Sequence, residues 1–286
     1  MAVSGKSKSA SKTSSKKAGK KAAPRAGKKT PSRKTTVSAL VPVYNEEKTA
    51  AILLNKLLAV PVVTEVIVVN DGSTDNSWEV LQSIKSPKIK LFNMEKNSGK
   101  TAAIRRAIQE ATGDVLFFQD ADLEYDPDEI ESVLEPILND TADVVYGSRF
   151  MTRKAARVLY FYHFLANKFL TFLCNTLTNL NMTDIETCYK AFRAPILKHI
   201  TLTSSGFGME VEITALISKM PLRIYEVPIS YYGRTYEEGK KIGMKDGIMA
   251  IWYIFQYNLL SPRTKTRKEY FRRVVEDLGP TVTPEA

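Results

Sequence analysis

The chain has little of what marks a secreted or membrane-spanning protein. Its two cysteines, Cys174 and Cys188, form neither a disulfide framework nor a metal-ligand spacing. A reduced, cytoplasmic protein is the simplest interpretation. No apolar run reaches the roughly 18–20 uncharged residues that a membrane-spanning helix needs. The two histidines, His163 and His199, belong to no motif, and we interpret them as structural or surface residues.

Acidic residues are absent before Glu46, whereas twelve of the 41 Lys and Arg residues lie at or before Lys34. The net charge of +10 is therefore concentrated in the first residues, because the remaining 29 basic residues nearly balance 31 acidic ones. Residues 1–35 contain no aromatic side chain and lack the apolar stretch of a secretion signal. We expect this Lys/Ser/Ala-rich tail to be disordered.

The basic tail is compatible with two kinds of partner or with none. Its charge would attract an anionic membrane surface or nucleic acid, and a solvated tail without a specific partner is equally compatible. A nucleic-acid-binding protein is the least favoured interpretation, since it leaves the carboxylate motifs described below unexplained.

The rest of the chain alternates apolar strand patterns with helical ones. With 286 residues and 44% hydrophobic content, it can form one large domain. The alternation predicts an α/β fold with a mainly parallel sheet flanked by helices. Expected strands are Val37–Val43, Glu65–Asn70, Ile89–Phe92, Val115–Gln119, Asp143–Tyr146 and Leu222–Ile229. Expected helices are Glu46–Leu58, Thr74–Ile84, Ser98–Ala111, Pro127–Leu138, Arg157–Asn179, Met209–Met220 and Gly247–Leu260.

Two of these helices are rich in aromatic residues. The pattern in Arg157–Asn179 and Gly247–Leu260 suits a membrane interface at headgroup level, and it suits an ordinary core as well. Core is the default interpretation. We expect the second of these helices to be the last ordered one. A charged extension, residues 261–286, should follow it as a helix that frays to a disordered end.

Three carboxylates follow the strand Val115–Gln119. Side chains at alternate positions of an extended chain point the same way, so Asp120, Asp122 and Glu124 are expected to converge on one point. Three converging negative charges require a cation, and hard oxygen ligands suit Mg²⁺ or Mn²⁺ together with substrate phosphates. For an isolated Asp-x-Asp, a solvated acidic turn would be the favoured alternative.

Other polar motifs also follow predicted strands. Tyr44 and Glu46 could stack on a base and accept from a ribose, or simply begin a helix. Asp71 could contact a base or ribose, or cap the helix that follows it. Lys100 opens a helix whose free N–H groups favour an anion, although the spacing of a Walker A loop is absent. Because parallel strands bind ligands at their carboxyl ends, these motifs together predict one site.

The motifs, in this order and spacing, resemble family 2 glycosyltransferases of GT-A fold, and most nearly the dolichyl-phosphate mannose synthase-like, or polyprenyl-phosphate sugar synthase, group. The resemblance covers roughly residues 36–260. The matching segments are Val41-Pro-Val-Tyr-Asn-Glu-Glu, Asn70-Asp-Gly-Ser-Thr-Asp, Asn97-Ser-Gly-Lys, Asp120-Ala-Asp, Gly147-Ser-Arg149, Asp184-Ile-Glu-Thr-Cys-Tyr-Lys-Ala-Phe-Arg193, Gly206-Phe-Gly-Met-Glu210 and Val227-Pro-Ile-Ser-Tyr-Tyr-Gly-Arg234.

The resemblance implies roles for individual residues. Arg149 would face the donor diphosphate or the acceptor phosphate, and Arg234 would bind the acceptor phosphate and close over the site. Asp120 and Asp122 would form the Asp-x-Asp pair, with Asp122 and Glu124 on the metal. The residues that would line the nucleotide pocket, with Asp71 reading the base and Lys100 nearby, are Pro42, Tyr44, Glu46 and Asp71.

The segment Asp184–Lys190 departs from the group's pattern. A lysine replaces the usual arginine at Lys190, which keeps the charge but loses bidentate phosphate recognition. A carboxylate also appears at Glu186. Lys190 and Arg149 would add electrostatic stabilisation. A hydroxyl acceptor would need a base, for which Asp184, Glu186 and Glu210 are candidates, although Asp184 and Glu210 could equally form salt bridges.

The resemblance implies an inverting, metal-dependent transferase that acts peripherally on the cytosolic face of a membrane. The donor would be a UDP- or GDP-sugar and the acceptor a polyprenyl phosphate. The alternative keeps the fold and transfers the sugar to a hydroxyl of a glycan or small molecule.

Overall fold

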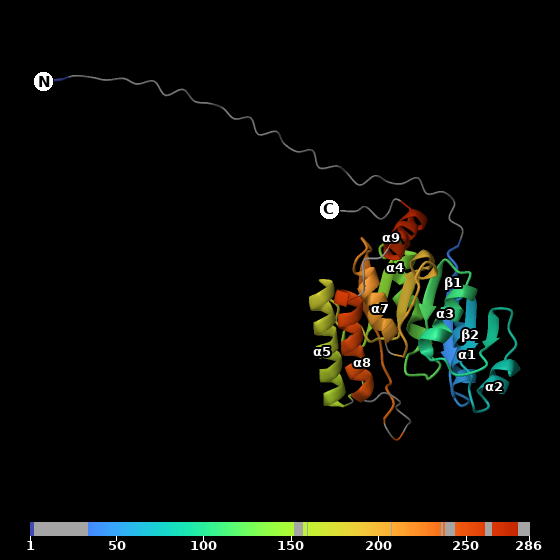
Figure 1. Cartoon of the computed structure of the whole chain (residues 1–286). Helices are drawn as coiled ribbons and strands as arrows, with labels where there is room; N and C mark the ends of the chain where they lie inside the picture. The colour runs from blue at the N-terminus through green and yellow to red at the C-terminus, as the bar shows by residue number, and fades with distance from the viewer. Residues whose placement is uncertain are drawn as a thin grey trace. The chain divides into compact units, whose positions relative to one another are not determined.

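The structure is a computed structural model that describes residues 1–2, 34–151, 157–158, 160–206, 208–235, 237, 244–260 and 265–279. The predicted disordered tail lies outside the described residues except at its two ends. Residues 261–264 and 280–286 of the charged extension also lie outside the described residues. Residues 34–279 contain the folded part described below (Figure 1).

Seven strands form one sheet within the described residues, in the order β3-β2-β1-β4-β6-β5-β7. Neighbours β3, β2, β1 and β4 are parallel, and β5 pairs with β7 in parallel. The predicted mainly parallel α/β sheet is therefore confirmed. The strands are β1 (Val37–Val43), β2 (Glu65–Asn70), β3 (Ile89–Asn93), β4 (Val115–Phe118), β5 (Val144–Ser148), β6 (Lys190–Arg193) and β7 (Ile224–Pro228).

Helices cover both faces of this sheet, and each face has its own apolar core. Side chains at alternate strand positions divide between the faces, so Leu40 and Leu116 enter one core while Ala39 and Val115 enter the other. The helices on the first face are α3 (Lys100–Glu110), α5 (Phe161–Thr178), α6 (Ala194–Lys198), α7 (Gly208–Ile217), α8 (Met244–Phe255) and α9 (Lys265–Leu278). The helices on the second face are α1 (Ala50–Ala59), α2 (Ser77–Ser83) and α4 (Ile130–Leu138), which the 3₁₀ turn η1 (Pro127–Glu129) precedes.

Strand β6 and helix α6 were not expected from the sequence. Strand β6 has only four residues, two of them charged, so it shows no apolar run. It runs antiparallel to both β4 and β5 and joins the two parallel parts of the sheet. This insertion brings Lys190 and the loop before it next to the end of β4.

The chain does not end its ordered part at Leu260. Helix α8 continues into the π-helical turn η2 (Gln256–Leu260), and α9 follows. The expectation that Gly247–Leu260 is the last ordered helix was wrong, because Tyr270 and Val274 of α9 are buried in the core. The Tyr270 hydroxyl also donates to the Ile196 carbonyl at 2.9 Å. Within the described residues, no helix is both long and apolar enough to cross a bilayer.

Candidate active site

The motifs that follow β1, β2 and β4 meet at one edge of the sheet. These strands are adjacent and parallel, so their carboxyl ends lie side by side. The turns after β1 and β2 are joined directly: the Asn45 amide donates to Ser73 Oγ at 3.0 Å, and the Thr74 amide donates to Asn45 Oδ1 at 2.8 Å. Pro42, in the register of β1 opposite Val69, and the half-buried Tyr44 lie at the same edge.

Asp71 holds the turn that opens α3. Its two carboxylate oxygens accept the backbone N–H groups of Ser98 and Gly99, each at 2.8 Å. Burial raises the pKa of Asp71, and these two hydrogen bonds oppose the rise. Each oxygen retains a lone pair, so the base-reading role of Asp71 stays a prediction.

Gly72 permits this arrangement. Its φ of +62° suits glycine, and a Cβ on it would lie 2.5 Å from the Lys96 carbonyl carbon. Backbone therefore approaches backbone too closely at this turn for any side chain.

Lys100 connects two carboxylates in the site. Its Nζ lies 2.8 Å from Asp120 Oδ1 and 3.7 Å from Glu210 Oε1, and it also donates to Cys188 Sγ at 3.0 Å. Burial disfavours the charged amine, but Asp120, Cys188 and Glu210 outweigh it and hold the pKa of Lys100 above its ordinary value. Lys100 thus neutralises the first carboxylate of the Asp-x-Asp pair.

Arg234 neutralises the second carboxylate. Its Nη2 lies 3.0 Å from Asp122 Oδ2 and 3.5 Å from Glu46 Oε1, and its Nε lies 3.2 Å from Glu124 Oε1. Burial, followed by the charges of Asp120 and Glu124, raises the pKa of Asp122 to about 7 even though Arg234 opposes the rise. One guanidinium does not balance this cluster.

The expected convergence of three carboxylates on one point is not seen. Asp120 faces Lys100, whereas Asp122 and Glu124 face Arg234. In the part of the chain that the structure describes, no three His, Cys, Asp or Glu side chains are placed to share a metal ion. The donor set still fits a divalent cation. Three carboxylates surround the single positive charge of Arg234, and Mg²⁺ or Mn²⁺ needs only one or two carboxylates besides phosphates. The metal role stays a prediction.

Arg149 and Asp184 form a buried bidentate pair. The Arg149 Nε and Nη2 atoms donate to the two Asp184 oxygens, each at 2.7 Å, and the Arg149 amide adds a bond of 3.1 Å. Burial would raise the pKa of Asp184, but Arg149 outweighs burial and lowers it. The alternative that Asp184 and Glu210 form salt bridges is confirmed, because Asp184 pairs with Arg149 and Glu210 with Lys100.

Lys190 lies beneath the site, so a direct phosphate contact from this buried position is not supported. Its side chain is fully buried, and its Nζ donates to the carbonyls of Ile185, at 3.1 Å, and Thr187. Burial lowers the pKa of Lys190, opposed by nearby acids, Glu210 first. The ammonium therefore stabilises the loop that carries Glu186, through its hydrogen bonds to these two carbonyls.

Glu186 has a buried oxygen without a hydrogen-bonding partner, Oε1. Burial, followed by the charge of Glu210, raises the pKa of Glu186 to about 8. The Glu210 Oε2 oxygen is likewise buried without a partner.

Three residues of the site were missed by sequence reasoning. The Tyr231 hydroxyl donates to Glu124 Oε2 at 2.7 Å, and the Tyr125 hydroxyl accepts the Cys188 amide at 3.1 Å. Cys188 also accepts from Lys100. No spacing signals these contacts, since they join segments more than 60 residues apart.

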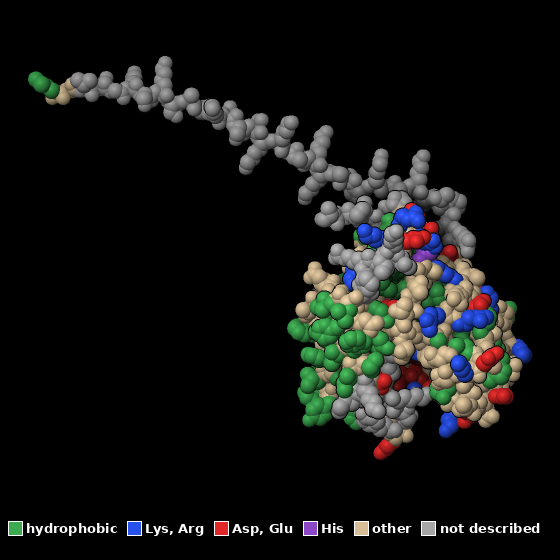
Figure 2. All heavy atoms as spheres, in the orientation of Figure 1, with side chains coloured by type: hydrophobic (Ala, Val, Ile, Leu, Met, Phe, Trp, Pro, Cys, Tyr) green, Lys and Arg blue, Asp and Glu red, His purple; other side chains and the backbone are tan. Residues whose placement is uncertain are grey.

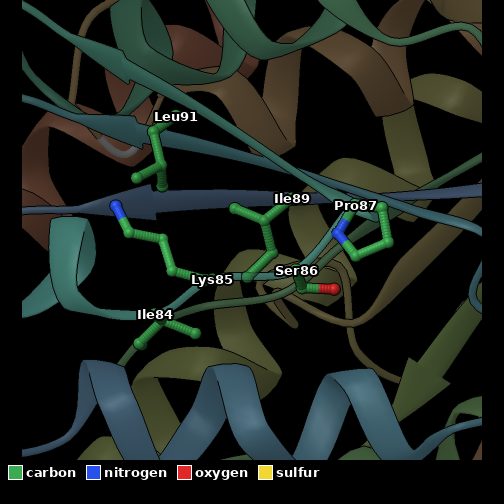
Figure 3. Close-up of a pocket in the computed structure, with 6 residues that line it drawn as sticks. All are labelled: Ile84, Lys85, Ser86, Pro87, Ile89 and Leu91. Atoms are coloured by element: carbon green, nitrogen blue, oxygen red, sulfur yellow. The ribbon is translucent and has the colours of Figure 1, made fainter.

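A separate pocket is lined by none of these residues, and Figure 3 shows the side chains that do line it. It is formed where the chain leaves α2 and enters β3, at the amino end of that strand. Its lining residues are Ile84, Lys85, Ser86, Pro87, Ile89 and Leu91. With one charged side chain among them, it offers no set of groups comparable to the strand-end site.

Residues 38–201 match the family model for glycosyl transferase family 2. A dolichol-phosphate mannosyltransferase of Pyrococcus furiosus is 29% identical over 213 residues, which cover 72% of this chain and 59% of that protein. The chain thus spans less than two thirds of that relative's length. An undecaprenyl-phosphate mannosyltransferase of Micrococcus luteus is also 29% identical, over 72% of this chain and 88% of that protein.

Among solved structures, a glucosyl-3-phosphoglycerate synthase of Mycobacterium tuberculosis, in complex with Mn²⁺, UDP and glucosyl-3-phosphoglycerate, has the same fold. The TM-score is 0.61 with 18% identity, over 78% of this chain and 80% of that one. Both the fold and the resemblance expected from the sequence are thereby confirmed. The chain belongs to glycosyl transferase family 2.

Proposed function

We propose that this chain moves a sugar from a nucleotide-sugar donor to a polyprenyl phosphate, inverting the anomeric carbon with the help of Mg²⁺ or Mn²⁺. The observation that carries the proposal is the meeting of Asp71, Lys100, Asp120 and Asp122 at one edge of a family 2 fold. The two mannosyltransferase relatives are named for dolichol phosphate and undecaprenyl phosphate, which supports a lipid-phosphate acceptor.

The donor would lie across the carboxyl ends of β1, β2 and β4. Pro42, Tyr44, Glu46 and Asp71 would contact the nucleoside, and Lys100 would lie beside the phosphates. Asp122 and Glu124 would hold the divalent cation, which as a Lewis acid would neutralise the leaving diphosphate. The solved neighbour's complex with Mn²⁺ and UDP supports a divalent cation and a nucleotide as the bound species.

The acceptor would approach Arg149. Asp184 fixes this guanidinium through two bonds, and the arginine side chain remains 13% exposed. A lipid phosphate is already ionised, so its attack needs no general base. This agrees with the engagement of Asp184, whose two oxygens both accept from Arg149 and which is therefore poorly placed to take a proton.

A second candidate keeps the donor and changes the acceptor to a hydroxyl. It is favoured by Glu186, whose buried, unpartnered oxygen and pKa of about 8 suit a group that takes a proton. The product distinguishes the two, because only a lipid-phosphate acceptor gives a product that organic solvent extracts.

A membrane surface is the proposed setting. Exposed apolar side chains of α5 and α8, which pack against each other, form an apolar face that Figure 2 shows over these helices. This apolar face consists of Phe161, Tyr162, Phe164, Leu165, Phe169, Phe172, Ile248, Met249, Trp252 and Phe255. Arg149 donates to Asn167 of α5 at 3.4 Å, so the face begins beside the proposed acceptor site. Aromatic side chains of this kind settle at the headgroup level of a bilayer.

Donor binding tests the proposal. Isothermal titration of the protein with UDP- and GDP-sugars in the presence of Mn²⁺ should give binding to at least one donor. Asp122→Asn should weaken it at least about a hundredfold, since it removes a charged ligand from the metal. Asp128→Asn, the same change at an exposed carboxylate of η1, should leave binding unchanged. Equal binding by wild type and Asp122→Asn would remove Asp122 from the metal site.

A further inference from the structure

The guanidinium of Arg234 lies between carboxylates from two different strand ends. Glu46 follows β1, whereas Asp122 and Glu124 follow β4, and each contributes an oxygen within 3.5 Å of an Arg234 nitrogen. Arg234 belongs to neither strand and reaches this point from the segment after β7. The Arg234 guanidinium is therefore the cation shared by the carboxylates that follow β1 and β4.

Glu124 and the loop that carries Arg234 are tied together. The Tyr231 hydroxyl donates to Glu124 Oε2 at 2.7 Å, and the amides of Tyr232 and Arg234 donate to the Glu124 carbonyl at 2.8 Å and to its Oε1 at 3.1 Å. The base of the loop is fixed separately, because Ser230 bonds Glu129 through its amide and hydroxyl at 2.6 and 2.8 Å. The arginine can thus change partners while the loop stays attached at Ser230.

The neighbouring cation is committed elsewhere. Lys100 pairs with Asp120 and Glu210. Of these two described cations, it is Arg234 that pairs with Glu46, Asp122 and Glu124. Three carboxylates against one guanidinium leave the cluster negative. Such a cluster favours a divalent cation, whose compact charge matches hard oxygens better than a planar guanidinium does.

We propose that Arg234 is the counter-cation of the donor-free site, and that a divalent metal arriving with a diphosphate takes its place. The inference rests on the proposed function. The two cations repel each other and cannot both lie between the same carboxylates. The displaced guanidinium gains the phosphate oxygens as new bidentate partners. Metal alone would have to break three contacts of Arg234 without that gain, so metal and diphosphate should bind cooperatively.

Binding of Mn²⁺ to the full chain, followed by the electron paramagnetic resonance signal of free Mn²⁺, tests this exchange. Without nucleotide, Arg234→Gln should bind Mn²⁺ at least about tenfold more tightly than wild type, because no guanidinium has to leave. Addition of UDP or GDP should strengthen Mn²⁺ binding to the wild type more than to the variant. Arg234→Lys, which keeps the charge without the fork, should lie between them.

Arg157→Gln is the matched control. Arg157 lies near the same loop, where it donates to the Gly233 carbonyl at 2.9 Å. Arg157→Gln removes one positive charge, as Arg234→Gln does. It should bind Mn²⁺ as wild type does, and an equal gain in Arg157→Gln would overturn the exchange as a general charge effect.

Two further outcomes separate the exchange from the proposed function. If Arg234→Gln and Arg234→Lys bind Mn²⁺ no more tightly than wild type while Asp122→Asn still loses it, the exchange is wrong and the metal site stands. If neither the wild type nor any variant binds Mn²⁺ with or without nucleotide, the proposed metal-dependent function fails as well.

Discussion

Glu186 is a carboxyl group of the site whose neutral form is favoured. Burial and Glu210 favour its neutral form, while Lys190 and Arg149 oppose them and Asp184 adds to the rise. Since its pKa rises from an ordinary value near 4.5 to about 8, the folded state binds this proton more tightly than the unfolded chain. The associated stability is complete below about pH 4.5 and is lost as the pH rises through about 8.

Glu186→Gln should remove this loss, because an amide does not ionise. The difference in unfolding free energy between the variant and the wild type should shift in favour of the variant by roughly 2–4 kcal/mol when the pH is raised from 5 to 8.5. Urea unfolding at both pH values measures the difference. Glu212→Gln is the control: Glu212 accepts from Thr203 and Ser204, so the variant should be destabilised at both pH values. A pH-independent effect of Glu186→Gln would contradict the raised pKa.

At this scale the sequence predicted residue types better than partners. Asp71, Asp120 and Asp122 were identified from their places after strands. Their contacts with Ser98, Lys100 and Arg234 join segments 20 to 112 residues apart, and no local pattern contains them. Lys190 shows the same limit: its charge predicted electrostatic stabilisation, but no local pattern indicated that its side chain is fully buried.

At the scale of elements, the turn between β2 and α2 positions the nucleotide motif. Gly72→Ala would place a Cβ against the backbone of Lys96 and Asn97, at 2.5 and 2.6 Å, at a positive φ. We expect a loss of about 2–4 kcal/mol of unfolding free energy and weaker nucleotide binding, because the Ser98 and Gly99 amides shift away from Asp71.

Gly99→Ala is the matched control for Gly72→Ala. Gly99 also has a positive φ, +89°, but nothing lies within 4 Å of its added Cβ. Only the backbone strain of about 1–3 kcal/mol should remain. Thermal unfolding and nucleotide titration of both variants measure the contrast, and equal losses in the two would contradict a role for the close approach at Gly72.

Long apolar runs made most elements predictable. The strands β1, β2 and β4 are buried on both faces and read as continuous apolar stretches. Strand β6 was not predicted, because its four residues include Lys190 and Arg193 and are too few to show an apolar pattern. Helix α9 was expected only as a fraying extension, since few of its residues are apolar, yet Tyr270 and Val274 anchor it.

For the whole molecule, the apolar face of α5 and α8 is the feature that sequence alone left open. An aromatic helix has the same composition whether it packs in a core or faces outward, so core was the default. The structure leaves Phe172 and Trp252 exposed by 68% and 52%. The default was wrong for these side chains, and their exposure supports the proposed contact with lipid.

Vesicle binding tests this contact. Phe172→Glu combined with Trp252→Glu should lower co-sedimentation of the full chain with anionic vesicles about tenfold or more, since each change puts a charge where the proposed contact would bury an apolar side chain in lipid. Ile52→Glu, at a 51% exposed position of α1 on the other face of the sheet, is the control and should have little effect. Unchanged binding by the double variant would exclude the apolar face as the contact.

The most direct test of the central claim is the fate of the transferred sugar. The full chain is incubated with a radiolabelled UDP- or GDP-sugar, Mn²⁺ and a polyprenyl phosphate, and the label is followed into the organic phase. The account predicts extractable label that disappears with a chelator or with Asp122→Asn. Label that stays in aqueous products, with hydroxyl acceptors supporting transfer and the lipid phosphate not, would contradict it.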